Sequence, residues 1–260
     1  MNKRRAFALT VATPVLLLAF NAAPAMANTG SGPIWTVSVS TTGRVTSTIT
    51  FAPSCDGAKA TLVVTSRSPH VVKGTSHRDV ILVKSAGHVI LAGAGNDKIC
   101  GSSGKDVING GVGHDRIFAG AGADTVLGGP GNDTVRGGAG NESVRGDSGN
   151  DVVGGDAGND TLRGGSGNDR LRGGNGNDVM GGDAGKDVVS GDLGDDRLNG
   201  GSGNDILSGG SGNDRLNGDL GDDSLHGDLG DDSVRGGAGT DVEDGGAGLD
   251  NINGLPEKLG

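Results

Sequence analysis

Residues 164–172 read Gly164-Gly165-Ser166-Gly167-Asn168-Asp169-Arg170-Leu171-Arg172, and this nine-residue unit recurs eighteen times without insertion between residues 92 and 253. The sixth position holds Asp in seventeen copies and Glu142 in the remaining one. The eighth position is aliphatic or Met in seventeen copies. A period this regular indicates a repeat architecture in which each unit packs on its neighbours.

Each position of the unit has a structural role. Glycines at positions one, two and four permit positive φ angles in a tight loop and close approach of neighbouring backbones. The three residues after the Asp are enough for one short strand whose middle side chain points inward. Two units close one flattened coil, and successive coils stack about 4.8 Å apart. The sequence therefore predicts an all-β fold, a parallel β-roll of about nine to ten coils, the first being a degenerate coil at 74–91.

The composition calls for a stabiliser other than an apolar core. The 260 residues include 55 Gly and only 2% aromatics, too little apolar surface to offset the entropy of ordering the chain. The net charge of −10, without a basic stripe or aromatic platforms, excludes nucleic acid as a partner. Carboxylates stacked along an edge repel by about 1 kcal/mol per neighbouring pair in water. Carboxylate and carbonyl oxygens suit Ca²⁺ before Mg²⁺, so a calcium ion is the expected stabiliser. The rival, a disordered acidic linker, does not explain the phased aliphatic residues.

The unit resembles the G-G-x-G-x-D-x-U-x nonapeptide of the repeats-in-toxin (RTX, hemolysin-type) calcium-binding family. The resemblance implies a right-handed parallel β-roll with Ca²⁺ ions between loops of adjacent coils, held by Asp carboxylates and loop carbonyls. On this sequence, one edge of the roll would stack Asp97, Asp115, Asp133, Asp151, Asp169, Asp187, Asp205, Asp223 and Asp241. The other edge would stack Asp106, Asp124, Glu142, Asp160, Asp178, Asp196, Asp214, Asp232 and Asp250. The gaps between these loops set a ceiling of about sixteen ions.

Departures from the unit predict local differences. Glu243 occupies an inward position and should disrupt the last coil, and Ser102 and Ala119 replace loop glycines near the start, where weaker sites are expected. In every other coil, position two is Asp instead of Gly on both edges: Asp147, Asp156, Asp183, Asp192, Asp219 and Asp228. These carboxylates add either metal ligands or only negative charge. Arginines at the outward positions seven and nine are interpreted as offsetting the acidic loops: Arg136, Arg145, Arg163, Arg172, Arg197 and Arg215.

The N-terminal segment 1–27 is typical of an export signal. A basic start at 3–5 and an apolar run at 7–20 precede a small-residue cleavage pattern at 25–27. The apolar run is short for a membrane span, so we expect a secreted, extracellular protein, by either the general secretory or the twin-arginine route. In an exported chain, Cys55 and Cys100 are expected to form a disulfide, with two free thiols as the alternative.

The remaining segments predict a cap and a tail. Residues 28–73 are rich in Ser, Thr and Val with alternating patterns, which predicts a small β cap of two to four strands over the open edge of the roll. A ligand-binding module is the rival interpretation. Residues 254–260 form a C-terminal tail.

The expected function is that of a secreted calcium-binding β-roll with a structural or interaction role. No H-E-x-x-H or G-x-S-x-G motif is present, so we expect no catalysis. The alternative is a calcium-dependent surface or matrix adhesion module with a ligand site in residues 28–73, whose partner the sequence does not name. An ice-binding face would need a rank of Thr, but position three holds mainly Ala, Ser and Leu.

Overall fold

The computed structural model describes residues 34–39, 45–50, 54–68, 70–253 and 255–256, with side chains described for 54–68 and 70–253. Every regular element in this part of the chain is a β-strand. No helix in the described ranges is long and apolar enough to cross a membrane. The expected export signal at 1–27 lies outside the described residues.

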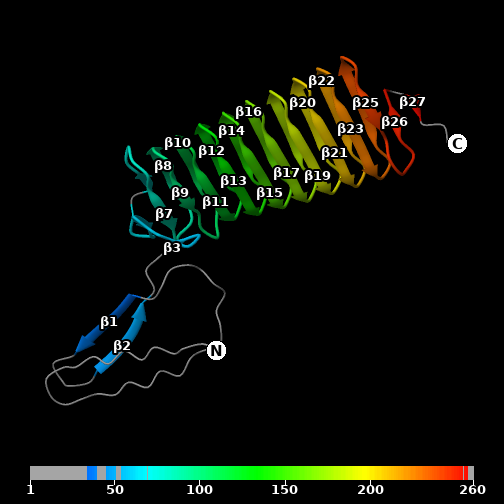
Figure 1. Ribbon diagram of the computed structural model, residues 1–260. Coiled ribbons are helices and arrows are strands. Elements are labelled where there is room, and N and C mark those ends of the chain that lie inside the picture. The colour runs from blue at the N-terminus through cyan, green and yellow to red at the C-terminus, as the bar shows by residue number, and fades with distance from the viewer. Residues whose placement is uncertain (1–33, 40–44, 51–53, 69, 254, 257–260) are drawn as a thin grey trace, which may run out of the picture. The chain divides into compact units, whose positions relative to one another are not determined.

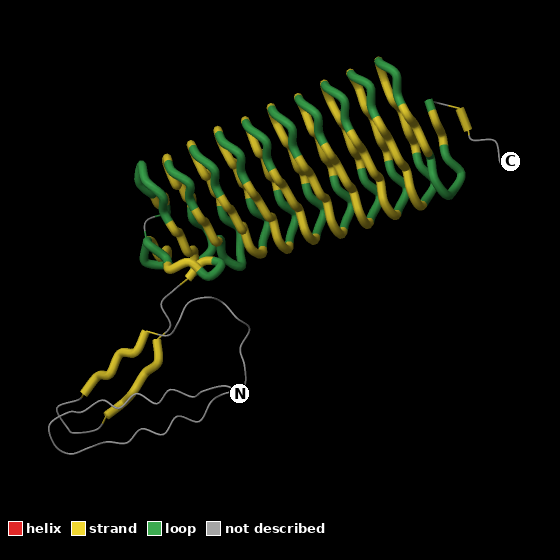
Figure 2. The backbone as a smooth tube through the Cα atoms, viewed as in Figure 1, coloured by secondary structure: helices red, strands yellow, loops and turns green. Residues whose placement is uncertain are grey.

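Two parallel sheets form a β-roll, and successive strands alternate between them, so each coil contributes one strand to each sheet (Figures 1 and 2). Sheet I contains β6 (Val71–Lys73), β8 (Val89–Ala94), β10 (Val107–Val112), β12 (Thr125–Pro130), β14 (Ser143–Ser148), β16 (Thr161–Ser166), β18 (Val179–Ala184), β20 (Arg197–Ser202), β22 (Arg215–Leu220), β24 (Ser233–Ala238), β26 (Asn251–Ile252) and the antiparallel β27 (Leu255–Pro256). Sheet II contains β5 (Leu62–Val64), β7 (Val80–Val83), β9 (Lys98–Cys100), β11 (Arg116–Ala121), β13 (Thr134–Ala139), β15 (Val152–Ala157), β17 (Arg170–Asn175), β19 (Val188–Leu193), β21 (Ile206–Ser211), β23 (Ser224–Leu229) and β25 (Val242–Asp244). Four further strands make two antiparallel hairpins: β1 (Ile34–Val39) with β2 (Val45–Thr50), and β3 (Ser54–Cys55) with β4 (Ala58–Lys59). The predicted parallel β-roll is confirmed.

The core of the roll is one stack of position-eight side chains from each sheet. Leu162 of sheet I pairs in register with Met180, eighteen residues later, and Leu171 of sheet II faces inward in the same way. All three side chains are at most 2% exposed. Most strands are six residues long, twice the predicted length, because parallel pairing resumes after the position-one glycine, as Asp147 with Gly165 and Ser148 with Ser166. Each coil therefore buries one aliphatic side chain and one glycine per strand.

The roll begins earlier than the nonapeptide pattern indicated. Strand β5 pairs in parallel with β7, and β6 pairs in parallel with β8. Both strands lie in the segment 28–73 that the sequence assigned to the cap. Val64 and Val72 are buried in the common core, although the loops around them lack the glycine and Asp pattern. Apolar burial alone thus continues the sheets past the repeats, giving eleven parallel strands in each.

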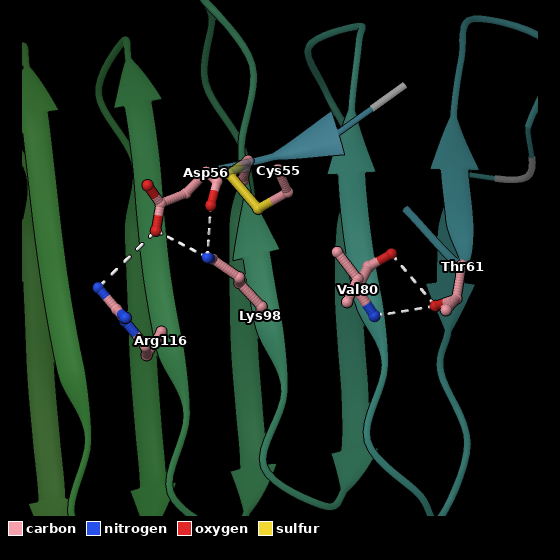
Figure 3. The surroundings of a disulfide bond; sticks show 7 residues. Cys55, Asp56, Thr61, Val80, Lys98 and Arg116 are labelled. Carbon is pink, nitrogen blue, oxygen red and sulfur yellow. Dashed lines mark hydrogen bonds and ion pairs between the residues drawn. A yellow bond between two sulfur atoms is a disulfide. The ribbon is translucent and has the colours of Figure 1, made fainter. Parts of the chain in front are cut away.

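A disulfide fixes the β3–β4 hairpin to the start of sheet II (Figure 3). Cys55 and Cys100 are bonded, as predicted, with their Cα atoms 5.5 Å apart. Beside the disulfide, the Lys98 ammonium donates to the Asp56 carbonyl oxygen at 2.7 Å and contacts the Asp56 carboxylate at 2.7 Å. The hydrogen bond from Lys98 to the Asp56 carboxylate lowers the pKa of that carboxyl. The hairpin is thus held by a covalent bond and an ion pair.

The opposite end of the roll is irregular around Glu243, as its inward position predicted. The Glu243 carboxylate is half-buried and accepts hydrogen bonds from the Gly236 backbone N–H and the Asn253 side-chain amide. Strand β25 is only three residues long. A carboxylate cannot enter the aliphatic stack without losing its hydration, so the last coil of sheet II is cut short.

Candidate metal site

The position-six carboxylates form two rows, one along each edge of the roll. The backbone N–H of a row residue donates to the Oδ1 atom of its counterpart eighteen residues later, except at Asp124, whose counterpart Glu142 accepts no hydrogen bond with either carboxylate oxygen. Asp151 donates to Asp169 at 2.7 Å, and Asp169 donates to Asp187 at 2.8 Å. The other edge repeats this geometry, with Asp160 donating to Asp178 at 2.7 Å. The structure thus stacks the residues in the two rows that the eighteen-residue coil predicts.

The second carboxylate oxygen of almost every row member is buried and has no hydrogen-bond partner. Asp169 is typical, with 1% of its surface exposed and no donor for Oδ2. Sixteen of the eighteen predicted residues share this arrangement: Asp97, Asp115, Asp124, Asp133, Glu142, Asp151, Asp160, Asp169, Asp178, Asp187, Asp196, Asp205, Asp214, Asp223, Asp232 and Asp250. A buried polar oxygen without a partner is costly, so each of these atoms points to a missing ligand.

The glycine at position one leaves the space in which these oxygens lie. A Cβ atom placed on Gly164 would lie 2.3 Å from Asp169 Oδ2 and 2.7 Å from the Gly182 carbonyl oxygen of the next coil. Any side chain there would displace both oxygens. The glycine at position four brings two coils together, because a Cβ on Gly167 would lie 2.0 Å from the Gly149 carbonyl oxygen. The unit therefore holds a carboxylate oxygen and a carbonyl oxygen next to each other in every coil.

Two predicted residues, Asp106 and Asp241, do not share this arrangement. Asp106 Oδ2 accepts from the Ser102 hydroxyl at 2.7 Å and from the Ser102 backbone N–H at 3.1 Å. Thr75 contacts Asp79 in the same way. Asp241 is not fully buried. The sequence pointed to Ser102 as a lost glycine; the structure adds that its hydroxyl satisfies the carboxylate that a cation would otherwise bind.

Burial makes the row carboxylates harder to ionise. It raises the pKa of Asp133 to about 7 and that of Asp196 to about 7, although the backbone N–H of the preceding coil opposes the shift in each case. Neighbouring row carboxylates raise these pKa values further. Burial, followed by the Asp160 carboxylate, raises the pKa of Glu142. Without a counter-charge, the rows are thus unfavourable in their ionised form at neutral pH.

A cation in these loops would be bound partly by the backbone. Among the described residues, no three His, Cys, Asp or Glu side chains converge on one point. The oxygens that lie close together are one carboxylate oxygen and one glycine carbonyl oxygen, such as Asp169 Oδ2 and the Gly182 carbonyl beside Gly164. A hard, geometrically tolerant cation that accepts six to eight oxygen ligands fits this donor set, which favours Ca²⁺ over Mg²⁺, Zn²⁺ or a softer metal.

The family model for the RTX calcium-binding nonapeptide repeat matches residues 89–252 in overlapping segments: 89–117, 118–153, 154–189, 181–216, 190–225, 208–243 and 217–252. The chain belongs to this family. Membership makes Ca²⁺ the expected ion for the RTX loops described above. A search of curated proteins finds no match. Among solved structures, the chain is similar to a hyperactive, Ca²⁺-dependent, β-helical antifreeze protein from an Antarctic bacterium, with 19% identity and a TM-score of 0.42 over 74% of this chain and 83% of that one.

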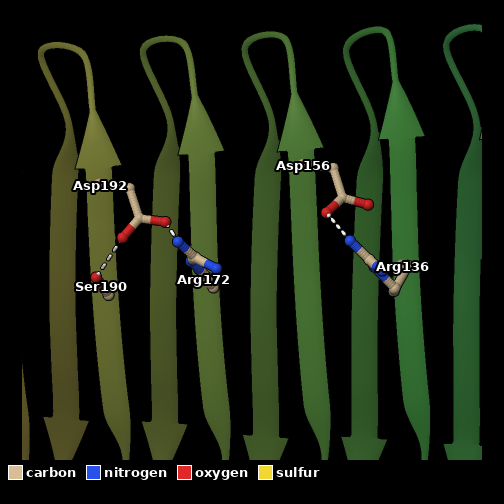
Figure 4. Close-up of polar contacts among 5 residues, drawn as sticks. All are labelled: Arg136, Asp156, Arg172, Ser190 and Asp192. Atoms are coloured by element: carbon tan, nitrogen blue, oxygen red, sulfur yellow. Dashed lines mark hydrogen bonds and ion pairs between the residues drawn. The ribbon is translucent and has the colours of Figure 1, made fainter.

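The position-two aspartates lie outside the RTX carboxylate rows, on the outer faces of the sheets (Figure 4). The Arg136 guanidinium contacts Asp156 at 2.6 Å, and Arg172 contacts Asp192. All six position-two aspartates have positive φ angles of 73–80°. Asp147, Asp156, Asp183 and Asp192 contact an arginine, while Asp219 accepts from asparagine amides and Asp228 from the Ser208 hydroxyl. Of the two roles left open by the sequence, surface charge is the one these contacts favour.

A ladder of position-five side chains also joins successive RTX coils, and the sequence interpretation missed it. The Asn168 backbone N–H donates to Asn150 Oδ1 at 2.7 Å, and Lys186 donates to Asn168 Oδ1 at 2.8 Å. On the other edge, Asn177 donates to Asn159 Oδ1 at 2.9 Å. The frequent Asn directly before the row carboxylate was the available signal, since an amide oxygen one coil away can accept the backbone N–H of the next loop.

Proposed function

We propose that this protein is exported, that its RTX roll folds when Ca²⁺ binds the carboxylate rows, and that it acts in a structural or interaction role without catalysis. The observation that carries this proposal is the set of sixteen row residues whose buried carboxylate oxygens have no partner. Family membership supports calcium as the ion.

The physical argument links ion binding to folding. Ionised carboxylates one coil apart repel each other, and one aliphatic residue per unit forms a thin core. The unfolded chain has no preformed sites, so the free energy of ion binding becomes free energy of folding. Extracellular modules bind Ca²⁺ with Kd values of about 10⁻⁴ to 10⁻³ M, too weakly for a calcium-poor cytosol. The chain would therefore cross the membrane unfolded and form the roll outside the cell.

The number of ions should be below the ceiling of about sixteen set by the gaps between loops. Asp106 is occupied by Ser102, and Asp241 is only partly buried, so the gaps that depend on them should bind weakly. We further propose that residues 1–27 direct export and that the segment around the β3–β4 hairpin caps the first coils. The adhesion alternative in residues 28–73 stays a prediction.

The test is a far-UV circular dichroism titration of the purified protein with Ca²⁺, with Mg²⁺ as the control ion. We expect a cooperative rise of β signal with Ca²⁺, because adjacent coils share ions, and little response to Mg²⁺. A complete β spectrum in excess chelator, or an equal response to both ions, would contradict calcium-coupled folding.

A further inference from the structure

The outward arginines fall into two groups once their contacts are compared. Four of them contact a position-two aspartate: Arg136, Arg145, Arg163 and Arg172. Arg197, Arg215 and Arg235 form no ion pair with any described carboxylate. Neutralising nearby carboxylates therefore explains the four paired arginines better than it explains Arg197, Arg215 and Arg235.

Arg197, Arg215 and Arg235 lie together on the outer face of sheet I. Arg197 on β20 is the direct neighbour of Arg215 on β22, and Arg235 on β24 is the neighbour of Asn217 on β22. All three line an open hollow of about 340 Å³. Like charges on directly paired strand positions repel, so this arrangement is unfavourable without a counter-charge.

The carboxylate of Asp219 on β22 is already engaged by amides. Asn199 Nδ2 donates to Asp219 at 2.7 Å, and Asn217 Nδ2 donates to the same carboxylate at 2.5 Å. Elsewhere on sheet I, the corresponding carboxylate is taken by an arginine, as Asp183 is by Arg163 at 2.8 Å. At position nine, Asn199 and Asn217 stand where an earlier coil has Arg163. Because these two amides bind Asp219, the guanidinium groups that line the hollow are free to bind an anion.

We propose that this hollow binds an acidic polysaccharide, a chain of uronic acid units lying across β20, β22 and β24. Guanidinium groups pair with carboxylates through two parallel hydrogen bonds, and here they repeat on successive strands about 4.8 Å apart. The side-chain oxygens of Asn199 and Asn217 line the same hollow and can accept sugar hydroxyls. Val179, 44% exposed, adds an apolar wall for the C–H face of a sugar ring. A small inorganic anion would use the charges but not the amides or the apolar wall.

The net charge of the protein opposes such a ligand unless the acidic rows are neutralised. The inference therefore rests on the proposed function: Ca²⁺ in the loops removes most of the opposing field, and the remaining long-range repulsion is screened within about 8 Å at physiological ionic strength. Binding of the polysaccharide should accordingly require the calcium-loaded roll.

The test is calorimetric titration of the calcium-loaded protein with short oligogalacturonides, with a neutral oligosaccharide of equal length as the control ligand. We expect binding that weakens with salt and is lost with the neutral ligand. Each substitution Arg197→Gln, Arg215→Gln or Arg235→Gln should weaken binding by about tenfold, because each removes one charge-assisted contact. The matched control is Arg170→Gln, since Arg170 has no ion pair either but stands between Val152 and Val188 on sheet II.

Circular dichroism of each variant in Ca²⁺ separates loss of binding from loss of fold, and it tests the calcium proposal independently of the ligand. If a variant fails to fold, the proposal is tested on the native protein by letting inorganic phosphate compete with the bound oligogalacturonide. Phosphate displacing the oligogalacturonide at equal concentration would overturn the polysaccharide assignment. So would equal weakening by Arg170→Gln, or binding to anionic phospholipid vesicles but not to the oligogalacturonide.

Discussion

The substitution Asp169→Asn should have opposite consequences with and without calcium. Asp169 lies in the middle of its row, and its Oδ1 accepts the Asp151 backbone N–H while its Oδ2 is buried without a partner. Asparagine keeps an oxygen for the first contact and removes the negative charge. A structural role for the carboxylate and a role as a cation ligand therefore predict different results.

The magnitudes follow from the stacking. Without calcium, the variant relieves repulsion from Asp151 and Asp187, which at a coil spacing of about 4.8 Å amounts to about 2 kcal/mol with the dielectric constant of water and about 7 kcal/mol at an effective value of 20. Burial also raises the pKa of the Asp169 carboxyl, so its ionised form is unfavourable without a counter-charge. With calcium, the variant removes one charged ligand from a buried site, which costs about 3 to 5 kcal/mol.

Urea unfolding followed by circular dichroism, in saturating calcium and in chelator, measures both effects. We expect a lower free energy of unfolding in calcium, a higher calcium midpoint for folding, and no loss of residual β signal in chelator. The control is Asp195→Asn, because Asp195 is exposed and its oxygen accepts the Asn213 backbone N–H at 2.9 Å, a contact that asparagine preserves. An equal loss of stability for Asp169→Asn in calcium and in chelator would refute a ligand role for this carboxylate.

Three further predictions concern pH, backbone packing and the disulfide. Burial raises the pKa of Asp133 to about 7 from an ordinary value near 3.8, so the calcium-free roll should be most stable below about pH 4 and lose that stability as the pH rises through 7. Calcium affinity should instead fall on acidification. Circular dichroism in chelator across this pH range measures the stability of the calcium-free roll, and a gain of structure above pH 7 would contradict the prediction. Gly167→Ala should lower the free energy of unfolding by more than about 3 kcal/mol, because the new Cβ would lie 2.0 Å from a carbonyl oxygen and the residue has φ at +128°. Gly154→Ala, whose Cβ would meet nothing closer than 4.0 Å, should be neutral or slightly stabilising in thermal unfolding. Equal effects of the two substitutions would argue against the close packing of the coils. Mass analysis of unreduced protein should find Cys55 linked to Cys100, and two alkylatable thiols in the native protein would contradict this. Replacing both cysteines with Ser should lower the free energy of unfolding by about 4 kcal/mol for a loop of this length.

The nine-residue period was sufficient to predict the roll, its core and the two carboxylate rows. An eighteen-residue coil places residue i beside residue i+18, so the stacking of Asp151 on Asp169 follows directly from counting. The Cys55–Cys100 bond was predictable from an even cysteine count together with the export expected from residues 1–27.

Other features depended on side-chain direction and on residues outside the pattern. Arg136 reaches Asp156, twenty residues away, because both side chains project from the outer face of adjacent strands. Val64 and Val72 continue the core without the glycine loops, so a pattern built on glycine began the roll too late, at residue 74. The Ser102 hydroxyl on Asp106 is a local contact that composition alone does not reveal.

The position-five ladder and a carboxylate row are interrupted at the same joint, which has a mechanical consequence. Ala123 has no side-chain acceptor, so among the described residues the Asn141 backbone N–H donates no ladder hydrogen bond, and neither carboxylate oxygen of Glu142 accepts the Asp124 N–H. The joint between Lys186 and Asn204 lacks only its ladder bond, since Asp187 still donates to Asp205 at 2.8 Å. In a stack where each coil is held only by its neighbours, an interior joint with fewer bonds opens first under load. A pulling force, or gradual loss of ions, should therefore part the roll between the coils of Asp124 and Glu142, which would leave two shorter rolls able to close again independently.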